Sequence, residues 1–484
     1  MNNIFSALKQ NTENYSDKTA LVYRENDAYK SISHCQLYQY IKSLSAFLTP
    51  GYKNKNIAII GNNKLEYLVS LLSVLGFVGN ALMIDKELDG DDIRKIFEQA
   101  EPDLVLLDDE IDFLYSKCKI IKFSEVQSII RQNSDFNADD DFCGNLILHT
   151  SGTTGEPKCI EFNEEQYYSV IPELNRKWNV TYEHSCLLII PLYHIYALTS
   201  MFHSLYAGLP IILEYDYKRL GNVLSECRPF LFMGVPLMYN KIKDAFLSQN
   251  ANKIKFFIRV SNILMFFKID VRKRLFKKAH DYFGGNYYFG CSAGSLLSQE
   301  TSRFFNDIGL PVYNVYGMTE TCGPVAISYK GHNECNCAGE ILEINSVELI
   351  NTSADGSGEI TVKGVNVFKG YVNDADKSYL SNGYFNTGDI GYVRDNHLFI
   401  IGRKKNILIR DNGKNISPEE LNGKILKFSG INDCNVVIKN NMLTAVIDTD
   451  LSPEHVKRII SSVNEKLPGY KKIHDFEITH KKIK

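Results

Sequence analysis

Short apolar runs alternate along much of this chain with longer segments that have helical spacing. The runs include NIAII at 56–60, DLVLL at 103–107, LILHT at 146–150 and PIIL at 210–213. Between them lie segments such as LEYLVSLLSVLGFVG at 65–79 and GDDIRKIFEQAEPD at 90–103. Short buried strands that alternate with helices are typical of parallel sheets covered by helices on both faces. The pattern therefore predicts an α/β fold.

The pattern changes near Ala338 to short alternating segments separated by Gly and Asn turns, such as GEITVKG and HLFIIG. This predicts a small antiparallel β-barrel at about residues 325–401, within a large N-terminal domain of two α/β sheet subdomains at 1–401. After GRKKN at 402–406 the pattern changes again, and SPEELNGKILKF has the features of a capped helix. We therefore expect a separate small α+β domain at 402–484.

Composition is that of a folded, enzyme-sized protein. The 484 residues are 44% hydrophobic and 23% charged, and the formal net charge of −3 gives no reason to expect nucleic acid as a partner. The first residues lack the basic start and apolar run of a secretory leader, and the 11 cysteines follow no repeating frame. These features favour a cytoplasmic protein with reduced thiols.

Two segments raise the question of membrane contact. The most apolar stretch, CLLIIPLYHIYALTSMF at 186–202, contains Pro191 and His194 and is too short to span a membrane, so it is interpreted as core. The basic stretch at 253–280 is amphipathic and favours a helix pair with one buried face. Peripheral contact with a membrane surface is the alternative for this stretch.

The loop HTSGTTGEPKCIEF at 149–162 follows an apolar run, where α/β proteins place ligand contacts. It is not the common nucleotide-binding loop, because two residues separate Gly152 from Gly155 and no Ser or Thr follows Lys158. Its hydroxyls, backbone N–H groups and ammonium are nevertheless able to hold a polyphosphate. Taken alone, the loop is equally typical of a polar surface turn.

Two later motifs offer complementary groups. In YNVYGMTET at 313–321, Thr319 and Glu320 supply a hydroxyl and a carboxylate that suit Mg²⁺ and its phosphates. In YFNTGDIG at 384–391, the carboxylate of Asp389 is able to accept two ribose hydroxyls. Each motif alone is also typical of a turn, so their order along the chain carries the argument.

Together these motifs resemble the adenylate-forming superfamily, which includes acyl-CoA synthetases, amino-acid adenylation domains and luciferases. The matching segments are, in the family's order, LILHTSGTTGEPK, PLYHIYAL, YNVYGMTET, GYFNTGDIG and GRKKNILIRDNGKNISPEEL. The resemblance implies an ATP-dependent acid–thiol ligase that needs Mg²⁺. A carboxylate attacks the α-phosphate to form an acyl adenylate and pyrophosphate, and a thiol then displaces AMP. It also implies that the C-terminal domain is mobile and rotates between the two steps.

The resemblance assigns roles to individual residues. The phosphate-binding residues are those of the first loop, namely Ser151, Gly152, Thr153, Thr154, Gly155 and Lys158. The residues expected to contact adenine and the rest of the nucleotide are Ser292, Ala293, Gly294, Asn314, Tyr316 and Gly317. Thr319 is expected to be catalytic, and Glu320 is expected to be both catalytic and the Mg²⁺ ligand. Asp389 and Arg403 are expected to bind the ribose.

Three further assignments fall in the C-terminal part. Lys405 occupies the hinge position, and Gly413 lies in the loop that approaches the thiol tunnel after rotation. Lys482 best fits the catalytic lysine that bridges the carboxylate and the α-phosphate. The chain departs from the family here, because it ends EITHKKIK and Lys481 stands where glycine is usual. A basic tail without this role, and with it a non-catalytic nucleotide-binding homologue, is the alternative.

The nature of the acid and of the thiol is less constrained. No acidic residue in PLYHIYALTSMF would pair with a substrate amine, which disfavours an amino acid. His194 is expected to close the carboxylate end of an acyl pocket, with a structural histidine as the alternative. The segments FKGY and GRKKNILIRDNGKNISPEEL look closest to fatty acyl-CoA synthetases, which favours an aliphatic acid over an aromatic one. The acceptor is CoA or the phosphopantetheine arm of an acyl carrier protein, which would place the enzyme in a biosynthetic pathway.

Overall fold

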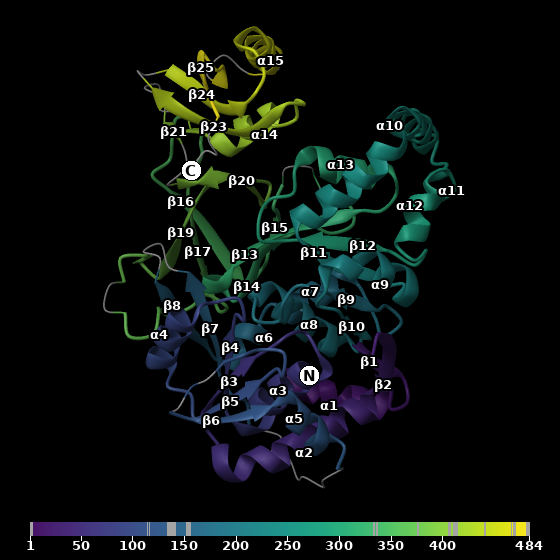
Figure 1. Ribbon diagram of the computed structural model, residues 1–484, viewed down its shortest axis with the longest axis vertical. Coiled ribbons are helices and arrows are strands. Elements are labelled where there is room, and N and C mark those ends of the chain that lie inside the picture. The colour runs from purple at the N-terminus through teal and green to yellow at the C-terminus, as the bar shows by residue number, and fades with distance from the viewer. Residues whose placement is uncertain are drawn as a thin grey trace. The chain divides into compact units, whose positions relative to one another are not determined.

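The computed structural model describes residues 3–113, 115, 117–132, 142–151, 156–332, 334, 337–374, 377–404, 408–409, 415–439, 442–465, 467 and 471–480. By internal packing the chain divides into two compact units. Unit 1 comprises Met1–Ser346 and Gly364–Lys377, and unit 2 comprises Val347–Lys363 and Ser378–Lys484. Figure 1 shows the elements of both units. The predicted α/β class is confirmed, whereas the domain limits expected at residues 401 and 402 stay a prediction.

The first sheet of unit 1 has the strand order β6-β5-β3-β4-β7-β8. Its strands are β3 (Asn56–Ile60), β4 (Asn80–Ile84), β5 (Leu104–Leu107), β6 (Lys119–Lys122), β7 (Leu146–Ser151) and β8 (Pro157–Phe162). All neighbours pair in parallel except β8, which runs antiparallel to β7. The connecting elements are α3 (Leu65–Ser73), η1 (Val74–Val78), α4 (Gly90–Ala100) and α5 (Phe123–Ile130), and α2 (His34–Tyr52) packs on α3 and α5. The apolar runs at 56–60, 103–107 and 146–150 are therefore central strands, as predicted.

The second group of strands in unit 1 follows the order β15-β14-β13-β12-β11-β9-β10-β1-β2. Its bounds are β1 (Thr19–Glu25), β2 (Ala28–Ser33), β9 (Cys186–Leu188), β10 (Ile211–Leu213), β11 (Leu231–Gly234), β12 (Phe289–Ser292), β13 (Val312–Met318), β14 (Gly323–Ile327) and β15 (Gly339–Ile341). Pairing is parallel from β13 to β1 and antiparallel at both ends of this group. Parallel strands that end at one edge bring Ser292 and Asn314 side by side, because these two residues are in register on β12 and β13.

Helices accompany this second group of strands. They are α1 (Ile4–Asn14), α6 (Glu164–Tyr168), α7 (Ile171–Trp178), α8 (Ile195–Ala207), α9 (Leu220–Cys227), α10 (Pro236–Phe266), α11 (Arg272–Leu275), α12 (Lys277–Tyr282) and α13 (Gln299–Asp307), with short 3₁₀ turns η2 (Tyr217–Arg219) and η3 (Thr319–Thr321). The stretch at 186–202 forms β9 and the start of α8, and most of its side chains are buried, as predicted. None of the helices in the described ranges is long and apolar enough to cross a membrane.

Unit 2 consists mainly of antiparallel strands followed by a small α+β portion. The strands are β16 (Asn345–Ile350), β17 (Gly358–Gly364), β18 (Leu380–Ser381), β19 (Tyr384–Arg394), β20 (His397–Arg403), β21 (Leu408–Ile409), β22 (Asn415–Ile416), β23 (Ile431–Lys439), β24 (Met442–Thr449) and β25 (Asp475–Thr479). The helices α14 (Pro418–Ile425) and α15 (Pro453–Glu465) share an apolar core with β23 and β24. The expected helix cap is present, because the Ser417 hydroxyl accepts a hydrogen bond from the Glu420 N–H.

Candidate functional site

The phosphate-loop motif lies between two paired strands, β7 and β8. Lys158 is in β8 opposite Thr150 of β7, and Cys159 is opposite His149. Because side chains alternate along a strand, Lys158 and Cys159 point to opposite faces. Cys159 is fully buried in the core that also contains residues of α4, whereas Lys158 lies on the other face of the strand. Residues 152–155 and the side chain of Ser151 lie outside the described residues.

The ammonium of Lys158 is held by residues near the end of unit 1. Its Nζ lies 2.8 Å from Oδ2 of Asp374 and 5.0 Å from the ring centroid of Tyr371. The segment that carries these residues is tied to β8, since the Val372 N–H donates to the Cys159 carbonyl at 2.8 Å. A cation held by one carboxylate and one aromatic face is available to a phosphate that competes for it.

Tyr371 connects the phosphate loop to the motif that carries Glu320. The Tyr371 hydroxyl donates to Oε1 of Glu320 at 2.8 Å, while its ring lies under Lys158. The backbone carbonyl of Glu320 accepts from the Phe368 N–H at 2.8 Å, so two contacts tie η3 to this segment. Tyr371 thus contacts both Lys158, the candidate phosphate-binding cation, and Glu320, the candidate Mg²⁺ ligand, which are far apart in the sequence.

The turn that presents Thr319 and Glu320 depends on a close backbone approach. A β-carbon on Gly317 would lie 2.1 Å from the carbonyl oxygen of Gly323, which no side chain can tolerate. The Thr321 hydroxyl donates to the Gly323 carbonyl at 2.7 Å and closes the turn. Gly317 therefore supports the site by allowing β13 and β14 to approach, and Glu320 is fixed at the end of β13.

Two buried polar atoms lie together at the carboxyl ends of β12 and β13. The Ser292 hydroxyl and the Oδ1 atom of Asn314 are buried and have no hydrogen-bond partner among the described residues. The Asn314 Nδ2 group donates to the Cys337 carbonyl at 2.9 Å, which orients the amide. Buried polar atoms are normally paired, so this pair fits the expected contact with a polar ring such as adenine.

Three more residues of the expected adenine site lie close by in the sequence, namely Ala293, Gly294 and Tyr316. Ala293 is buried, and Gly294 has a φ of +84° with open space where a β-carbon would be. That backbone conformation turns the chain away from β12 and suits glycine. Tyr316 lies half-buried on β13, two residues after Asn314. All five residues expected to line the adenine therefore lie at the carboxyl ends of β12 and β13 or on β13 itself.

His194 lies at the start of α8 beside a second histidine that the sequence did not single out. The Asp85 N–H donates to Nε2 of His149 at 3.1 Å, and burial lowers the pKa of His149 to about 4. The pKa of His194 is also lowered by the protein atoms that surround its ring, and the charge of Asp85 opposes this shift. A positive charge on His194 would further lower the pKa of His149. His149 is the first residue of the HTSGTTG motif, and that position was the available signal.

The candidate ribose-binding residues belong to unit 2. Asp389 of β19 and Arg403 of β20 are opposite each other in the strand register, and their side chains form an ion pair at 2.9 Å. Arg403 also donates to the Thr387 carbonyl at 3.1 Å, while the Asp389 N–H donates to the Thr387 hydroxyl. Asp389 is almost fully buried, so its carboxylate position is well defined. Lys405, Gly413 and Lys482 lie outside the described residues.

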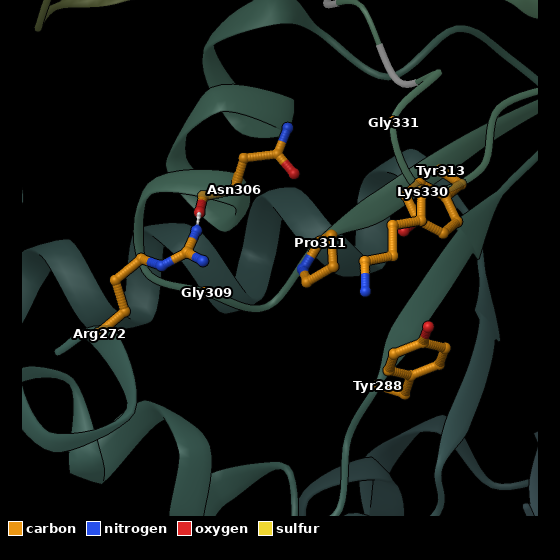
Figure 2. A pocket seen from close by; sticks show the side chains of 8 residues that line it. All are labelled: Arg272, Tyr288, Asn306, Gly309, Pro311, Tyr313, Lys330 and Gly331. Carbon is orange, nitrogen blue, oxygen red and sulfur yellow. Dashed lines mark hydrogen bonds between the residues drawn. The ribbon is translucent and has the colours of Figure 1, made fainter. Parts of the chain in front are cut away.

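A pocket of about 230 Å³ lies at the other edge of the same strands. Figure 2 shows its lining, which includes Tyr288 before β12 and Pro311 before β13. Arg272 also lines the pocket, and its guanidinium pairs with Asp270 and donates to the Asn306 carbonyl at 2.9 Å. Since Ser292 and Asn314 lie at the opposite, carboxyl ends, this pocket is separate from the candidate site.

The family of AMP-binding enzymes matches residues 8–372. This is most of the chain, so the protein belongs to that family, and the predicted resemblance to the adenylate-forming superfamily is confirmed. Among individual proteins, it is similar to a long-chain-fatty-acid–CoA ligase of Mus musculus, at 26% identity over 476 residues that cover 85% of this chain and 71% of the mouse protein. A long-chain-fatty-acid–CoA ligase of Mycobacterium bovis is 29% identical over 307 residues, which cover 58% of this chain and 50% of that protein.

Solved structures share the fold at low sequence identity. Unliganded O-succinylbenzoate coenzyme A synthetase of Bacillus subtilis superposes with a TM-score of 0.74 at 18% identity, covering 98% of this chain and 99% of that protein. ATP-bound MatB of Rhodopseudomonas palustris gives a TM-score of 0.76 at 21% identity, covering 99% and 95%. A fatty acyl CoA synthetase of Mycobacterium tuberculosis gives 0.68 at 19% identity, covering 99% and 94%. These matches confirm the predicted architecture.

Proposed function

We propose that this chain is an AMP-forming acid–thiol ligase that activates a long-chain fatty acid with ATP and transfers the acyl group to CoA. The observation that carries the proposal is the contact of Tyr371 with both Lys158 and Glu320. A cation for phosphate and a carboxylate for a hard metal ion are the two groups that a metal–triphosphate complex needs. The contacts of Tyr371 with both residues support the proposal.

The residues of unit 1 fit a bound nucleotide. The unpaired atoms of Ser292 and Asn314 offer hydrogen bonds to a base, and Lys158 offers its charge to the β- and γ-phosphates. Glu320 would hold Mg²⁺, which supplies positive charge that offsets repulsion between the phosphates and the attacking carboxylate. Ribose binding by Asp389 and Arg403, which belong to unit 2, stays a prediction from their motifs.

The proposed reaction has two balanced steps. A carboxylate oxygen of the acid bonds to the α-phosphorus of ATP, and the bond between that phosphorus and the bridging oxygen breaks to release pyrophosphate. A thiolate then bonds to the acyl carbon, and the bond to AMP breaks. We assign to neutral His194 the position next to the carboxyl group, where an uncharged imidazole offers a hydrogen bond without fixing the anion as an ion pair.

A long-chain fatty acid is proposed as the substrate because the mouse and mycobacterial relatives are named as ligases of such acids. An aromatic acid is the main alternative to a long-chain fatty acid as the substrate. CoA is proposed as the thiol for the same reason, and a carrier-protein arm presents the same chemistry. The proposed cytoplasmic location is supported by the cysteines, since those in the described part of the chain are free thiols.

The test is acid-dependent exchange of pyrophosphate into ATP with a panel of long, medium and short fatty acids and benzoate. Exchange is expected with long-chain acids, and Glu320→Gln should lower it by roughly 100-fold or more, as for loss of a charge-stabilising group. Glu98→Gln, an exposed change on α4, is the matched control and should leave exchange unchanged. Absence of exchange with every acid would contradict the enzyme and favour a nucleotide-binding homologue.

The acceptor is tested separately by presenting CoA and a phosphopantetheinylated carrier protein to enzyme that has formed the acyl adenylate. Thioester formation with CoA and not with the carrier protein is the expected result. The converse result would assign the chain to the loading of a carrier protein. Lys482→Ala should abolish adenylate formation while leaving thioester formation from added acyl adenylate, if Lys482 has its predicted role.

A further inference from the structure

The last turns of α10 and the residues that follow present large apolar side chains to solvent. We call this surface the α10 tip. Its side chains are exposed by between 51% and 83%, whereas most large apolar residues of unit 1 are buried. They are Phe256 (60%), Ile263 (62%), Phe266 (83%), Phe267 (65%) and Ile269 (51%). A group of exposed apolar side chains of this kind marks an interaction site.

The exposed side chains share one face of the helix. Phe256, Ile263 and Phe266 are spaced by seven and three residues, which places them along one stripe. Other positions of α10 face the protein, since the Phe257 ring packs edge-on against Phe276 with centroids 6.4 Å apart. The stripe therefore does not take part in the packing of the helix, and Figure 1 shows α10 at the outer edge of unit 1.

The end of α10 holds a defined shape. The Ile269 N–H donates to the Leu264 carbonyl at 3.0 Å and the Lys268 N–H donates to the Met265 carbonyl at 2.8 Å, which is the Schellman ending of a helix. Lys268 adopts the left-handed conformation that this ending requires, with φ of +61°. Phe266, Phe267 and Ile269 are thus presented together by a closed turn.

The stretch of sequence that contains the α10 tip is strongly basic. Between residues 253 and 280 there are nine lysines and arginines and one acidic residue, whereas the whole chain has a formal charge of −3. That acidic residue, Asp270, is already paired with Arg272 at 2.6 Å. The basic residues are Lys253, Lys255, Arg259, Lys268, Arg272, Lys273, Arg274, Lys277 and Lys278. A partner for this surface must be apolar at its centre and anionic around it.

We propose that the α10 tip docks on the surface of a bilayer that contains anionic phospholipid. A second copy of the chain would bring the same positive charge into contact, so electrostatics disfavours self-association. A lipid surface satisfies both requirements, since the apolar stripe enters the boundary between headgroups and acyl chains while the basic residues meet the phosphates. This docking is independent of the ligase chemistry.

Vesicle flotation tests the docking with the full chain. Vesicles of phosphatidylcholine with phosphatidylglycerol should carry the protein at low salt and release it at high salt, and pure phosphatidylcholine should carry it weakly. Phe266→Ser with Phe267→Ser should lower the partition coefficient at least about tenfold, from the loss of two inserted rings. The matched control is Phe47→Ser, a half-exposed phenylalanine on α2, which should leave partition unchanged.

Charge is tested by Lys255→Glu with Arg259→Glu, against Lys117→Glu with Lys119→Glu, which are exposed elsewhere on unit 1. Only the first pair should weaken binding, and more so at low salt. Thermal unfolding of each variant should match that of the parent, because the side chains are exposed. No flotation with anionic vesicles would overturn the proposal. Concentration-dependent dimers that Phe266→Ser with Phe267→Ser dissolves would also overturn it and identify the tip as a subunit contact.

Discussion

The ammonium of Lys158 lies 2.8 Å from the carboxylate of Asp374, in a segment more than two hundred residues further along the chain. Lys158, which is predicted to bind the triphosphate of ATP, thus forms an ion pair with a carboxylate of the protein itself. A phosphate that binds Lys158 must share or displace this carboxylate. If Lys158 has its predicted role, Asp374 competes with the nucleotide for the lysine.

Asp374→Asn should strengthen ATP binding. Removal of the competing charge releases the ion pair, and partly exposed pairs contribute about 0.2–1 kcal/mol, which corresponds to a KM for ATP that is about 1.5-fold to fivefold lower. Steady-state kinetics over a range of ATP concentrations measures this change. Asp270→Asn removes an ion pair with Arg272 outside the site and should leave KM unchanged. A higher KM in Asp374→Asn would instead show that the aspartate positions Lys158 for phosphate.

Tyr371 acts through its neighbours, so we predict a positioning role for its hydroxyl. Tyr371→Phe keeps the ring under Lys158 and removes the hydrogen bond to Glu320. The Mg²⁺ concentration for half-maximal activity should rise roughly twofold to tenfold, as for loss of one hydrogen bond, while KM for the acid stays the same. Titration of Mg²⁺ at saturating ATP measures this. Tyr182→Phe, in a ring stacked on Tyr15, is the control, and equal changes in both variants would contradict the assignment.

The sequence predicted the central strands well because their signal is local. The apolar runs at 56–60 and 103–107 form β3 and β5, since a buried strand needs only a few consecutive apolar residues and flanking turns. The cap of α14 at Ser417 was predicted for the same reason, because the capping contact spans three residues. Lys158 and Glu320 were singled out by motif order rather than by any property of the residues alone.

The contacts that join these motifs could not be predicted from the sequence. Tyr371 was noted only as part of FKGY, and nothing local indicates that its hydroxyl meets Glu320. Asp374 follows three residues later as an ordinary loop acid, yet it pairs with Lys158 across the fold. Such pairings are fixed by the packing of distant segments, which depends on the whole fold. The burial that lowers the pKa of His149 is a property of the same kind.

Cys159 directly follows Lys158 in β8. Its side chain is fully buried and points away from the face of Lys158. Cys159→Gly should therefore lower the free energy of unfolding by about 1–3 kcal/mol, from lost burial and added chain freedom, and leave KM for ATP unchanged. Urea unfolding and ATP kinetics measure the two effects. Cys159→Ala should have the smaller effect on stability, and a sharply lower KM for ATP in Cys159→Gly would refute this account.

His203 on α8 is expected to destabilise the folded state at low pH. Its ring lies 5.2 Å from that of Trp178, and neither ring nitrogen has a hydrogen-bond partner among the described residues. Complete burial lowers the pKa of His203 to about 3. The unfolded chain, with an ordinary histidine pKa near 6.5, therefore binds a proton that the folded chain excludes as pH falls between these values.

Stability should consequently fall by roughly 1.4 kcal/mol per pH unit below about pH 6.5 because of His203 alone, and the contribution is fully restored above that pH. His203→Leu keeps the volume, removes the unpaired nitrogens and should raise the free energy of unfolding more at pH 5 than at pH 7. Trp178 is the only tryptophan of the chain, so its fluorescence reports the unfolding of unit 1 in urea at the two pH values. His455→Leu, at an exposed position of α15, should not change this pH dependence. An equal gain at both pH values would mean that packing, and not protonation, limits the stability at this position.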